Sequence, residues 1–252
     1  GKAQWIDLKG LPAAPPVSLN TKKKMGYEVI MKNNKYGVAN AMKEVIIKPE
    51  YDQIRHGILG PDDEPDYKKK LFLVKTSKGW GIVDDKNEEI IPPQYQECTP
   101  FRFGYALVKE KDRWGAYNMK GKKVLNIEYD KLSLGNSLVF LTEKKISKDS
   151  SVFGYYHVER KNISTTPYKE GDDMYFGMAA VLKDSLWGYL NDQGKEVTEF
   201  KFHTAAPFLI DSGKFAMVTL NKKFGIIDPD GQYIVFPKYK AIPKFSEGLF
   251  VV

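Results

Sequence analysis

The sequence contains very little cysteine and histidine. Among its 252 residues there is one cysteine, Cys98, and there are three histidines. A single cysteine cannot form an internal disulfide, and no histidine stands near Cys98 in the sequence to activate it as a nucleophile, so we expect a structural residue. His56, His157 and His203 show none of the short spacings typical of metal sites. We expect no metal and no cofactor, with His157 in a turn and His56 in a solvated loop.

Long apolar runs and catalytic motifs are also missing. The longest apolar stretches, such as LFLV and GLFVV, have the length of strands and fall far short of the roughly 20 residues that a membrane helix needs. There is no GxSxG sequence, no Walker loop and no dinucleotide fingerprint. The carboxylate pairs Asp62-Asp63, Asp84-Asp85 and Asp172-Asp173 are interpreted as residues of solvated turns, because neighbouring residues of a strand point to opposite faces. We therefore do not expect an enzyme.

The net charge of +7 comes from lysines that are spread along the chain. Local clusters occur at residues 22–24, 68–70 and 222–223. Lysines between strands are most often solvated and discourage edge-to-edge aggregation of sheets. A nucleic-acid partner would require the lysines to share one stripe, so we do not expect one.

The sequence is rich in one short motif, an aromatic residue followed by glycine. The glycines of successive copies are 34 to 44 residues apart, a period typical of repeat proteins. We call the aromatic residue of each copy the anchor. Five of the six copies carry Asp or Asn four positions after the anchor, and all six carry an aromatic residue fifteen positions after it. The six pairs are Tyr36-Gly37, Trp80-Gly81, Trp114-Gly115, Phe153-Gly154, Trp187-Gly188 and Phe224-Gly225.

Each copy predicts a small antiparallel sheet. Two apolar runs separated by a few polar residues indicate a hairpin, and the Asp or Asn after the second run indicates a turn into a third strand. We expect the anchor to pack between successive units and the glycine to leave room for a neighbouring ring or backbone. Trp187 is then a core residue, and its truncation should cost about 3 to 5 kcal/mol.

The motif resembles the WG-repeat (KWG-repeat) family. The pairs at Trp80, Trp114 and Trp187 match its name-giving dipeptide, and WGIVDDKNEEIIPPQY matches its longer pattern. The copy at Phe153 departs from it, because His157 replaces the turn residue. The resemblance implies a β-rich module of a kind common in bacterial proteins, often exported or in the cell envelope, with no catalytic residues to carry over.

We expect an all-β fold of tandem antiparallel repeats with three to four strands each. A single domain over 1–252 would hold seven units, approximately 1–31, 32–74, 75–108, 109–148, 149–182, 183–218 and 219–252. Asp7 and Gly10 follow Trp5 in the repeat pattern but lack a first strand, and the C-terminal strand lacks a hairpin to follow it. That strand can complete the N-terminal unit, so we favour a closed propeller-like ring, with an open β-solenoid as the alternative.

Function is expected where the chain does not repeat. The two longest insertions are residues 56–70 and 142–151, and insertions that do not serve the core often bind ligands. We expect a non-catalytic binding or scaffolding module for a protein partner or a cell-envelope glycan. The alternative is a carbohydrate-active enzyme whose carboxylates converge from different repeats in a deep pocket. In the first insertion, the candidate binding residues are Asp62, Asp63, Tyr67, Lys68, Lys69 and Lys70.

Overall fold

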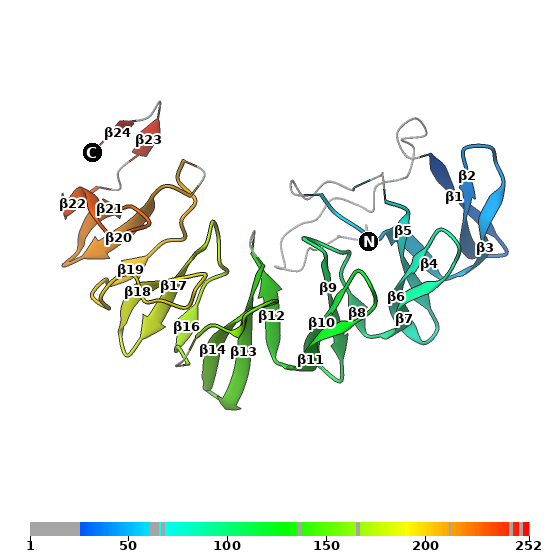
Figure 1. The fold of residues 1–252 in the computed structure, drawn as a ribbon, viewed down its shortest axis with the longest axis horizontal. Coiled ribbons are helices and arrows are strands. Elements are labelled where there is room, and N and C mark those ends of the chain that lie inside the picture. The colour runs from blue at the N-terminus through cyan, green and yellow to red at the C-terminus, as the bar shows by residue number, and fades with distance from the viewer. Residues whose placement is uncertain are drawn as a thin grey trace, which may run out of the picture. The chain divides into compact units, whose positions relative to one another are not determined.

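The computed structural model of this protein consists of strands and turns (Figure 1). It describes residues 26–60, 66, 69–135, 138–164, 167–211, 213–241, 244–246 and 249–251. No helix occurs in these ranges, and so none that could cross a membrane. The predicted all-β class is confirmed. Contacts divide the chain into two compact units, Gly1–Arg102 and Phe103–Val252, and each is described by itself.

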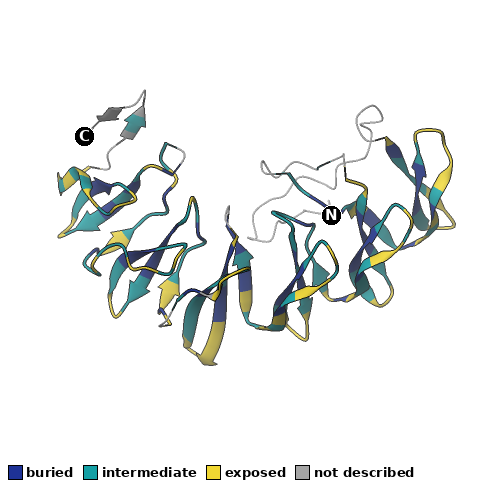
Figure 2. Cartoon of the chain, viewed as in Figure 1, coloured by how far each residue is buried: buried dark blue, intermediate teal, exposed yellow. Residues whose placement is uncertain are grey.

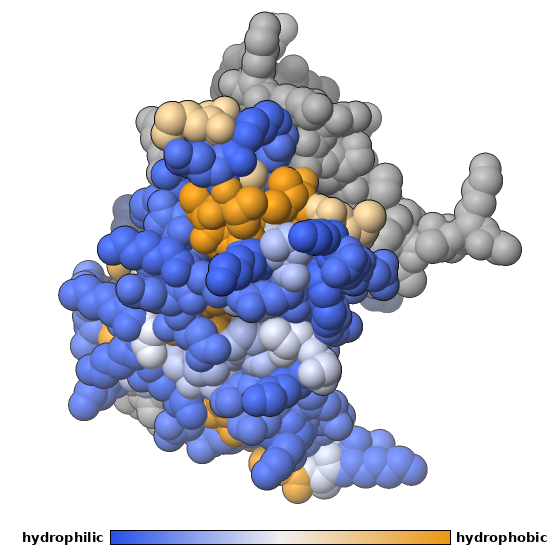
Figure 3. All heavy atoms as spheres, turned by 90° about the vertical axis from the view of Figure 1, so that its right-hand side faces the viewer, coloured by the Kyte–Doolittle hydropathy of each residue, from blue (hydrophilic) through white to orange (hydrophobic). Residues whose placement is uncertain are grey.

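The first unit holds two sheets in which strands that follow one another in the sequence pair antiparallel. The first sheet contains β1 (Tyr27–Lys32), β2 (Lys35–Asn40) and β3 (Val45–Tyr51). The second contains β4 (Gln53–His56), β5 (Leu71–Thr76), β6 (Gly79–Asp84) and β7 (Glu89–Tyr95), and the short β8 (Glu97–Cys98) follows it. Figure 3 looks onto the first sheet and shows hydrophobic surface framed by hydrophilic side chains.

The second unit repeats the same antiparallel plan. Its strands form three- and four-stranded groups and a final pair, as the repeat pattern predicts. They are β9 (Tyr105–Glu110), β10 (Arg113–Asn118) and β11 (Lys123–Tyr129); β12 (Lys131–Leu134), β13 (Val139–Ser147), β14 (Ser150–His157) and β15 (Lys161–Asn162); β16 (Glu170–Gly171), β17 (Met178–Lys183) and β18 (Leu186–Asn191); β19 (Thr204–Ala205), β20 (Ala216–Leu220), β21 (Lys223–Ile227) and β22 (Tyr233–Tyr239); and β23 (Lys244–Ser246) with β24 (Leu249–Val251).

Each anchor forms a cross-strand pair with the aromatic residue fifteen positions later. Trp80 on β6 lies opposite Tyr95 on β7, and Trp187 forms the same kind of bridge with Phe202. The other four anchors pair in the same way with the aromatic residue fifteen positions later. Aromatic pairs on neighbouring strands stabilise a sheet. In four repeats the pair fixes the register of the third strand, and at Phe153 and Trp187 it is an isolated bridge.

The glycine after the anchor makes room for a bulge in the third strand. Between the Trp80 pair and the next pair, the register of β6 and β7 shifts. A Cβ atom on Gly81 would meet the carbonyl oxygen of Ile91 and would lie 2.5 Å from the nitrogen of Pro93. At Gly188 the neighbour is instead the ring of Phe200, 3.1 Å away. Both of the predicted reasons for the glycine, backbone and ring, therefore occur.

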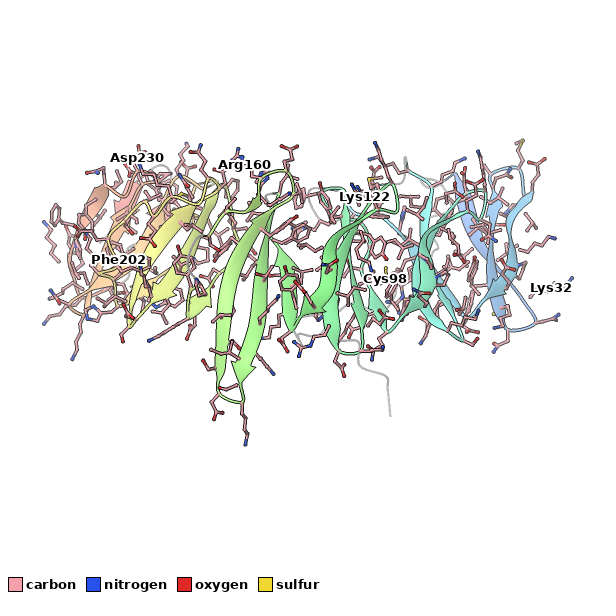
Figure 4. All side chains as sticks on the ribbon, turned by 60° about the horizontal axis from the view of Figure 1, so that its bottom comes forward. Lys32, Cys98, Lys122, Arg160, Phe202 and Asp230 are labelled. Carbon is pink, nitrogen blue, oxygen red and sulfur yellow. The ribbon has the colours of Figure 1, made fainter. Side chains whose placement is uncertain are left out.

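The residue four positions after the anchor closes the turn into the third strand. In five repeats its side-chain oxygen accepts hydrogen bonds from the backbone N–H groups two and four residues later, as at Asn118. His157 does the same with Nδ1, which accepts from the N–H groups of Glu159 and Arg160, so its predicted place in a turn is confirmed. Lys122, Arg160 and Asp230, which belong to these turns, lie along one rim of the second unit (Figure 4).

The core is built mainly from residues beside the anchors. Figure 2 shows the buried residues along the strands of the sheets. Trp187 packs against a buried cluster as predicted, but it is only partly buried. Its strand neighbour Tyr189 and its partner Phe202 are fully buried. The hydroxyl groups of Tyr189 and the equivalent Tyr155 donate to backbone carbonyls beyond the first strand of the next sheet, each over 2.7 Å. The expectation that the anchor itself fills the core is thus too strong.

Residues 1–25 of the predicted N-terminal unit, 1–31, lie outside the described residues. Trp5, Asp7 and Gly10 all precede residue 26, where the description begins. The division into seven units and the choice between a closed ring and an open solenoid therefore stay predictions.

Candidate functional site

The first insertion is described only in part. Asp62, Asp63, Tyr67 and Lys68 lie outside the described residues. The Nζ atom of Lys70 lies 3.3 Å from Asp85 Oδ2, and both side chains are substantially exposed. The backbone N–H of Lys69 donates to the carbonyl of Asp66 over 3.3 Å. The binding site predicted for this insertion stays a prediction.

His56, at the start of this insertion, is not a solvated loop residue. It ends β4, where it pairs with Phe72, and its Nε2 lies 2.8 Å from the hydroxyl oxygen of Tyr27. Burial lowers its pKa, and the nearby Asp66 acts in the opposite direction. The expectation is wrong because the insertion leaves the sheet only after residue 56: the N–H of Gly57 still donates to the carbonyl of Leu71.

Cys98 behaves as a structural residue should. Burial raises the pKa of its thiol to about 12, so the reactive thiolate is not formed at neutral pH.

The second insertion forms the longest hairpin of the protein's described part. Strands β13 and β14 have nine and eight residues, whereas the corresponding hairpin strands elsewhere have five or six. Their pairing continues out to Ser147 and Ser150, and the residues from Lys144 to Ser147 are exposed. Ile146, near the tip, has 66% of its surface exposed. The hairpin stands out beyond the other strands in Figure 4.

A pocket of about 410 Å³ lies beside the outer half of this hairpin, within the second unit, and the tip residues 148–151 are part of its lining. The hairpin supplies Glu143, residues 148–151 and Phe153. Residues 169–172, in and around β16, form another wall, and Trp187 of β18 completes the lining. We call this the hairpin pocket. It joins the insertion to two anchors, so scaffold residues contribute to a site that the repeat alone does not create.

Glu143 is the most deeply buried carboxylate of the hairpin pocket. Only 5% of its surface is exposed. Its Oε1 atom accepts a hydrogen bond of 2.7 Å from the Ser151 hydroxyl. Its Oε2 atom forms an ion pair with Lys131 Nζ, 3.2 Å away on the neighbouring strand β12.

Asp172 places a second carboxylate in the pocket. Burial raises its pKa, and the charges of Asp173 and Glu170 raise it further, because like charges disfavour ionisation. The hydroxyl of Tyr155 donates to its backbone carbonyl and holds this segment in place. The side chain of Asp173 accepts a hydrogen bond from Ser133. The interpretation of Asp172 and Asp173 as a solvated turn is therefore wrong.

The described residues contain no group of three or more His, Cys, Asp or Glu side chains placed to hold a metal ion. The hairpin pocket holds four carboxylates, Glu143, Asp149, Glu170 and Asp172. The insertion of residues 142–151 was the signal in the sequence that pointed here. No local signal linked it to Asp172 or Trp187, which reach the pocket through the fold.

A family model described as WG containing repeat matches the chain at residues 36–56, 80–114, 114–134, 187–224 and 224–252, which together make up more than half of it. Comparison with curated proteins finds no match.

Among solved structures, the chain is similar to Hsv2p from Kluyveromyces lactis, with 12% identity and a TM-score of 0.37, over 81% of this chain and 71% of that one. It is also similar to an uncharacterised protein from Listeria monocytogenes, with 10% identity and a TM-score of 0.36, over 86% and 78% of the two chains. A third similar structure is TolB from Acinetobacter baumannii, with 11% identity and a TM-score of 0.31, over 82% of this chain and 62% of that one. At these values the likeness carries no argument about what this chain binds or does.

Proposed function

This chain belongs to the family of proteins built from WG containing repeats, and we propose that it is a non-catalytic binding or scaffolding module for a protein partner. The observation that carries the proposal is the hairpin pocket beside the outer half of the long β13–β14 hairpin. Repeat units supply a rigid scaffold, and the departures from the repeat supply the ligand site.

The hairpin favours a protein partner over a glycan. It exposes Ile146 on a segment that extends beyond the core, and an apolar side chain next to a concave polar site is typical of protein interfaces. The pocket behind it can accept one side chain of the partner. An exported location in the cell envelope is part of the proposal, and its support is the family resemblance alone.

The experiment compares partner capture by the native chain and by a variant with a shortened hairpin. Replacing residues 146–150 with Asn-Gly keeps the pair of Lys145 with Ser151 and closes a two-residue hairpin turn. A matched control replaces Lys111-Asp112, at the tip of the β9–β10 hairpin, with the same dipeptide. We expect quantitative mass spectrometry to show partners that the shortened variant loses and the control retains.

Two outcomes contradict the proposal. Capture that is equal for all three chains would place the binding surface elsewhere. Binding to a glycan array that depends on the hairpin, without any protein capture, would assign the site to a glycan.

A second candidate, a carbohydrate-active enzyme, is favoured by one specific observation. The hairpin pocket holds carboxylates in different environments: Asp172 has a raised pKa, as a general acid needs, whereas Glu143 lies beside Lys131. Release of reducing sugar from an envelope glycan by the native chain, abolished in Asp172→Asn, would establish this candidate in place of the first.

A further inference from the structure

We infer that the hairpin pocket receives a cationic group, the ammonium or guanidinium of a lysine or arginine side chain on the protein partner. The inference rests on the proposed function and adds the chemistry of the group that is bound. Four features of the pocket carry it: the balance of charge, a buried carboxylate held in a fixed orientation, the repulsion among its carboxylates, and its aromatic walls.

The charge of the pocket is opposite to that of the chain. Its lining contains four carboxylates and two lysines, Lys148 and Lys169, while the whole protein carries a net charge of +7. The ammonium group of Lys169 already donates to the backbone carbonyl of Asp184 over 2.8 Å. Lys131, which is ion-paired with Glu143, adds a third positive charge, so four carboxylates face three lysines and a cation that enters the pocket still meets an excess of negative charge.

Glu143 supplies the fixed acceptor. Cross-strand pairing places it opposite Lys131 and Phe153, and its Oε1 atom is held by the Ser151 hydroxyl. The side chain is therefore oriented before any ligand arrives, and its Oε2 atom forms an ion pair with Lys131 Nζ, 3.2 Å away. An ammonium or guanidinium group carries several donors, and a charge-assisted hydrogen bond to such an oxygen is stronger than a neutral one.

Asp172 and Glu170 supply the second reason for a cation. They line the wall of the pocket that β16 supplies, and the pKa of Asp172 is raised first by burial and then by the negative charges of Asp173 and Glu170. A bound cation relieves this repulsion and favours the ionised carboxylate. An anionic ligand would increase this repulsion, because carboxylates line both walls of the pocket.

The aromatic walls suit the same ligand. Phe153 and Trp187 line the pocket, and a cation over the face of an aromatic ring is attracted by the ring quadrupole. This protein already uses that contact within the second unit, where Lys109 Nζ lies 5.5 Å from the centre of the Trp114 ring. The long aliphatic part of a lysine or arginine side chain can pack on the same surface.

The test measures binding of a small lysine probe to the full chain by nuclear magnetic resonance. N-acetyl-lysine methylamide is titrated while the indole N–H signal of Trp187 is followed, and N-acetyl-norleucine methylamide serves as the uncharged match. We expect a saturable shift with the lysine probe, and with its arginine counterpart, that the norleucine probe does not produce. The lysine shift should weaken as salt is raised, because added ions screen the charges.

Variants assign the shift to the pocket. Asp172→Asn should weaken binding of the lysine probe at least fivefold, and Glu143→Gln should weaken it further. Asp230→Asn removes the same charge from an exposed turn on the rim of the second unit and should leave binding unchanged. Because Glu143 is buried and its substitution can perturb folding, the result with Asp172→Asn decides the assignment.

Equal shifts with the lysine and norleucine probes, or native affinity in Asp172→Asn, would overturn the inference. If capture of a protein partner still depended on the hairpin in that case, the proposed function would stand without it. Tighter binding of glucosamine than of the lysine probe would also overturn it, because the cation would then come from a sugar.

Discussion

Replacing Gly81 with alanine tests whether the glycine after the anchor exists to admit the bulged third strand. The added Cβ would lie 2.5 Å from the nitrogen of Pro93 and 2.6 Å from the carbonyl carbon of Pro92. Ordinary van der Waals contact between carbon atoms begins at about 3.5 Å, so β7 would have to move by about 1 Å. Those atoms are backbone, which cannot turn aside as a side chain can. We expect a loss of about 2 to 3 kcal/mol in the free energy of unfolding, as for overpacked cores.

The matched control is the same substitution at the same repeat position, Gly154→Ala. There the nearest atoms are the hydroxyl oxygens of Thr142, at 3.2 Å, and Ser164, at 3.5 Å, which belong to side chains that can shift. We expect a change within about 1 kcal/mol, because alanine also loses less backbone entropy on folding than glycine. Urea denaturation followed by circular dichroism measures both variants, and hydrogen exchange of β6 and β14 separates the two compact units. Equal losses in the two variants would refute the steric reasoning.

Two further predictions concern the second unit. Trp187→Ala should lower the free energy of unfolding by about 2 kcal/mol, less than the roughly 3 to 5 kcal/mol of fully buried rings, because the indole is only partly buried. Urea denaturation measures this change, and a loss of 4 kcal/mol or more would show that the anchor dominates the core. Asp172→Asn should make the protein more stable at neutral pH, because the folded-state pKa of Asp172 is raised and ionisation of this group opposes folding. The native chain loses this stability as pH rises through the folded-state pKa, so the difference between the chains should vanish below about pH 4, which thermal unfolding from pH 3 to 8 can test.

The repeat architecture could be predicted from the sequence because its signals are local and recur. Six aromatic residues at one offset become six cross-strand pairs, and five Asp or Asn residues become five equivalent turns. The degree of burial was harder to predict. Alternation in a strand indicates which residues share a face. It does not indicate that Tyr189 and Phe202 are buried more completely than the anchor Trp187.

The hairpin pocket could not be predicted because its parts are brought together by the packing of separate sheets. Glu143 and Asp172 are 29 residues apart, and neither has a neighbour in the sequence that indicates a site. The pair Asp172-Asp173 resembles a solvated turn until Tyr155, from another sheet, is seen to fix its backbone. In the sequence, only the excess length of residues 142–151 indicated this region. It indicated the hairpin but not residues 169–172, which form another wall of the pocket.

Each anchor and its cross-strand partner are always fifteen residues apart, so the segment between them has a constant length. The hairpin that precedes and includes the anchor can vary in length. An insertion between the two paired residues would move the third strand out of register and reverse the faces of its side chains. An insertion in the preceding hairpin only lengthens a ladder, as β13 and β14 show. New binding segments can therefore be grafted at the hairpin tips of this protein while the remaining repeats keep their pairing, which makes these tips natural attachment points for engineered recognition loops.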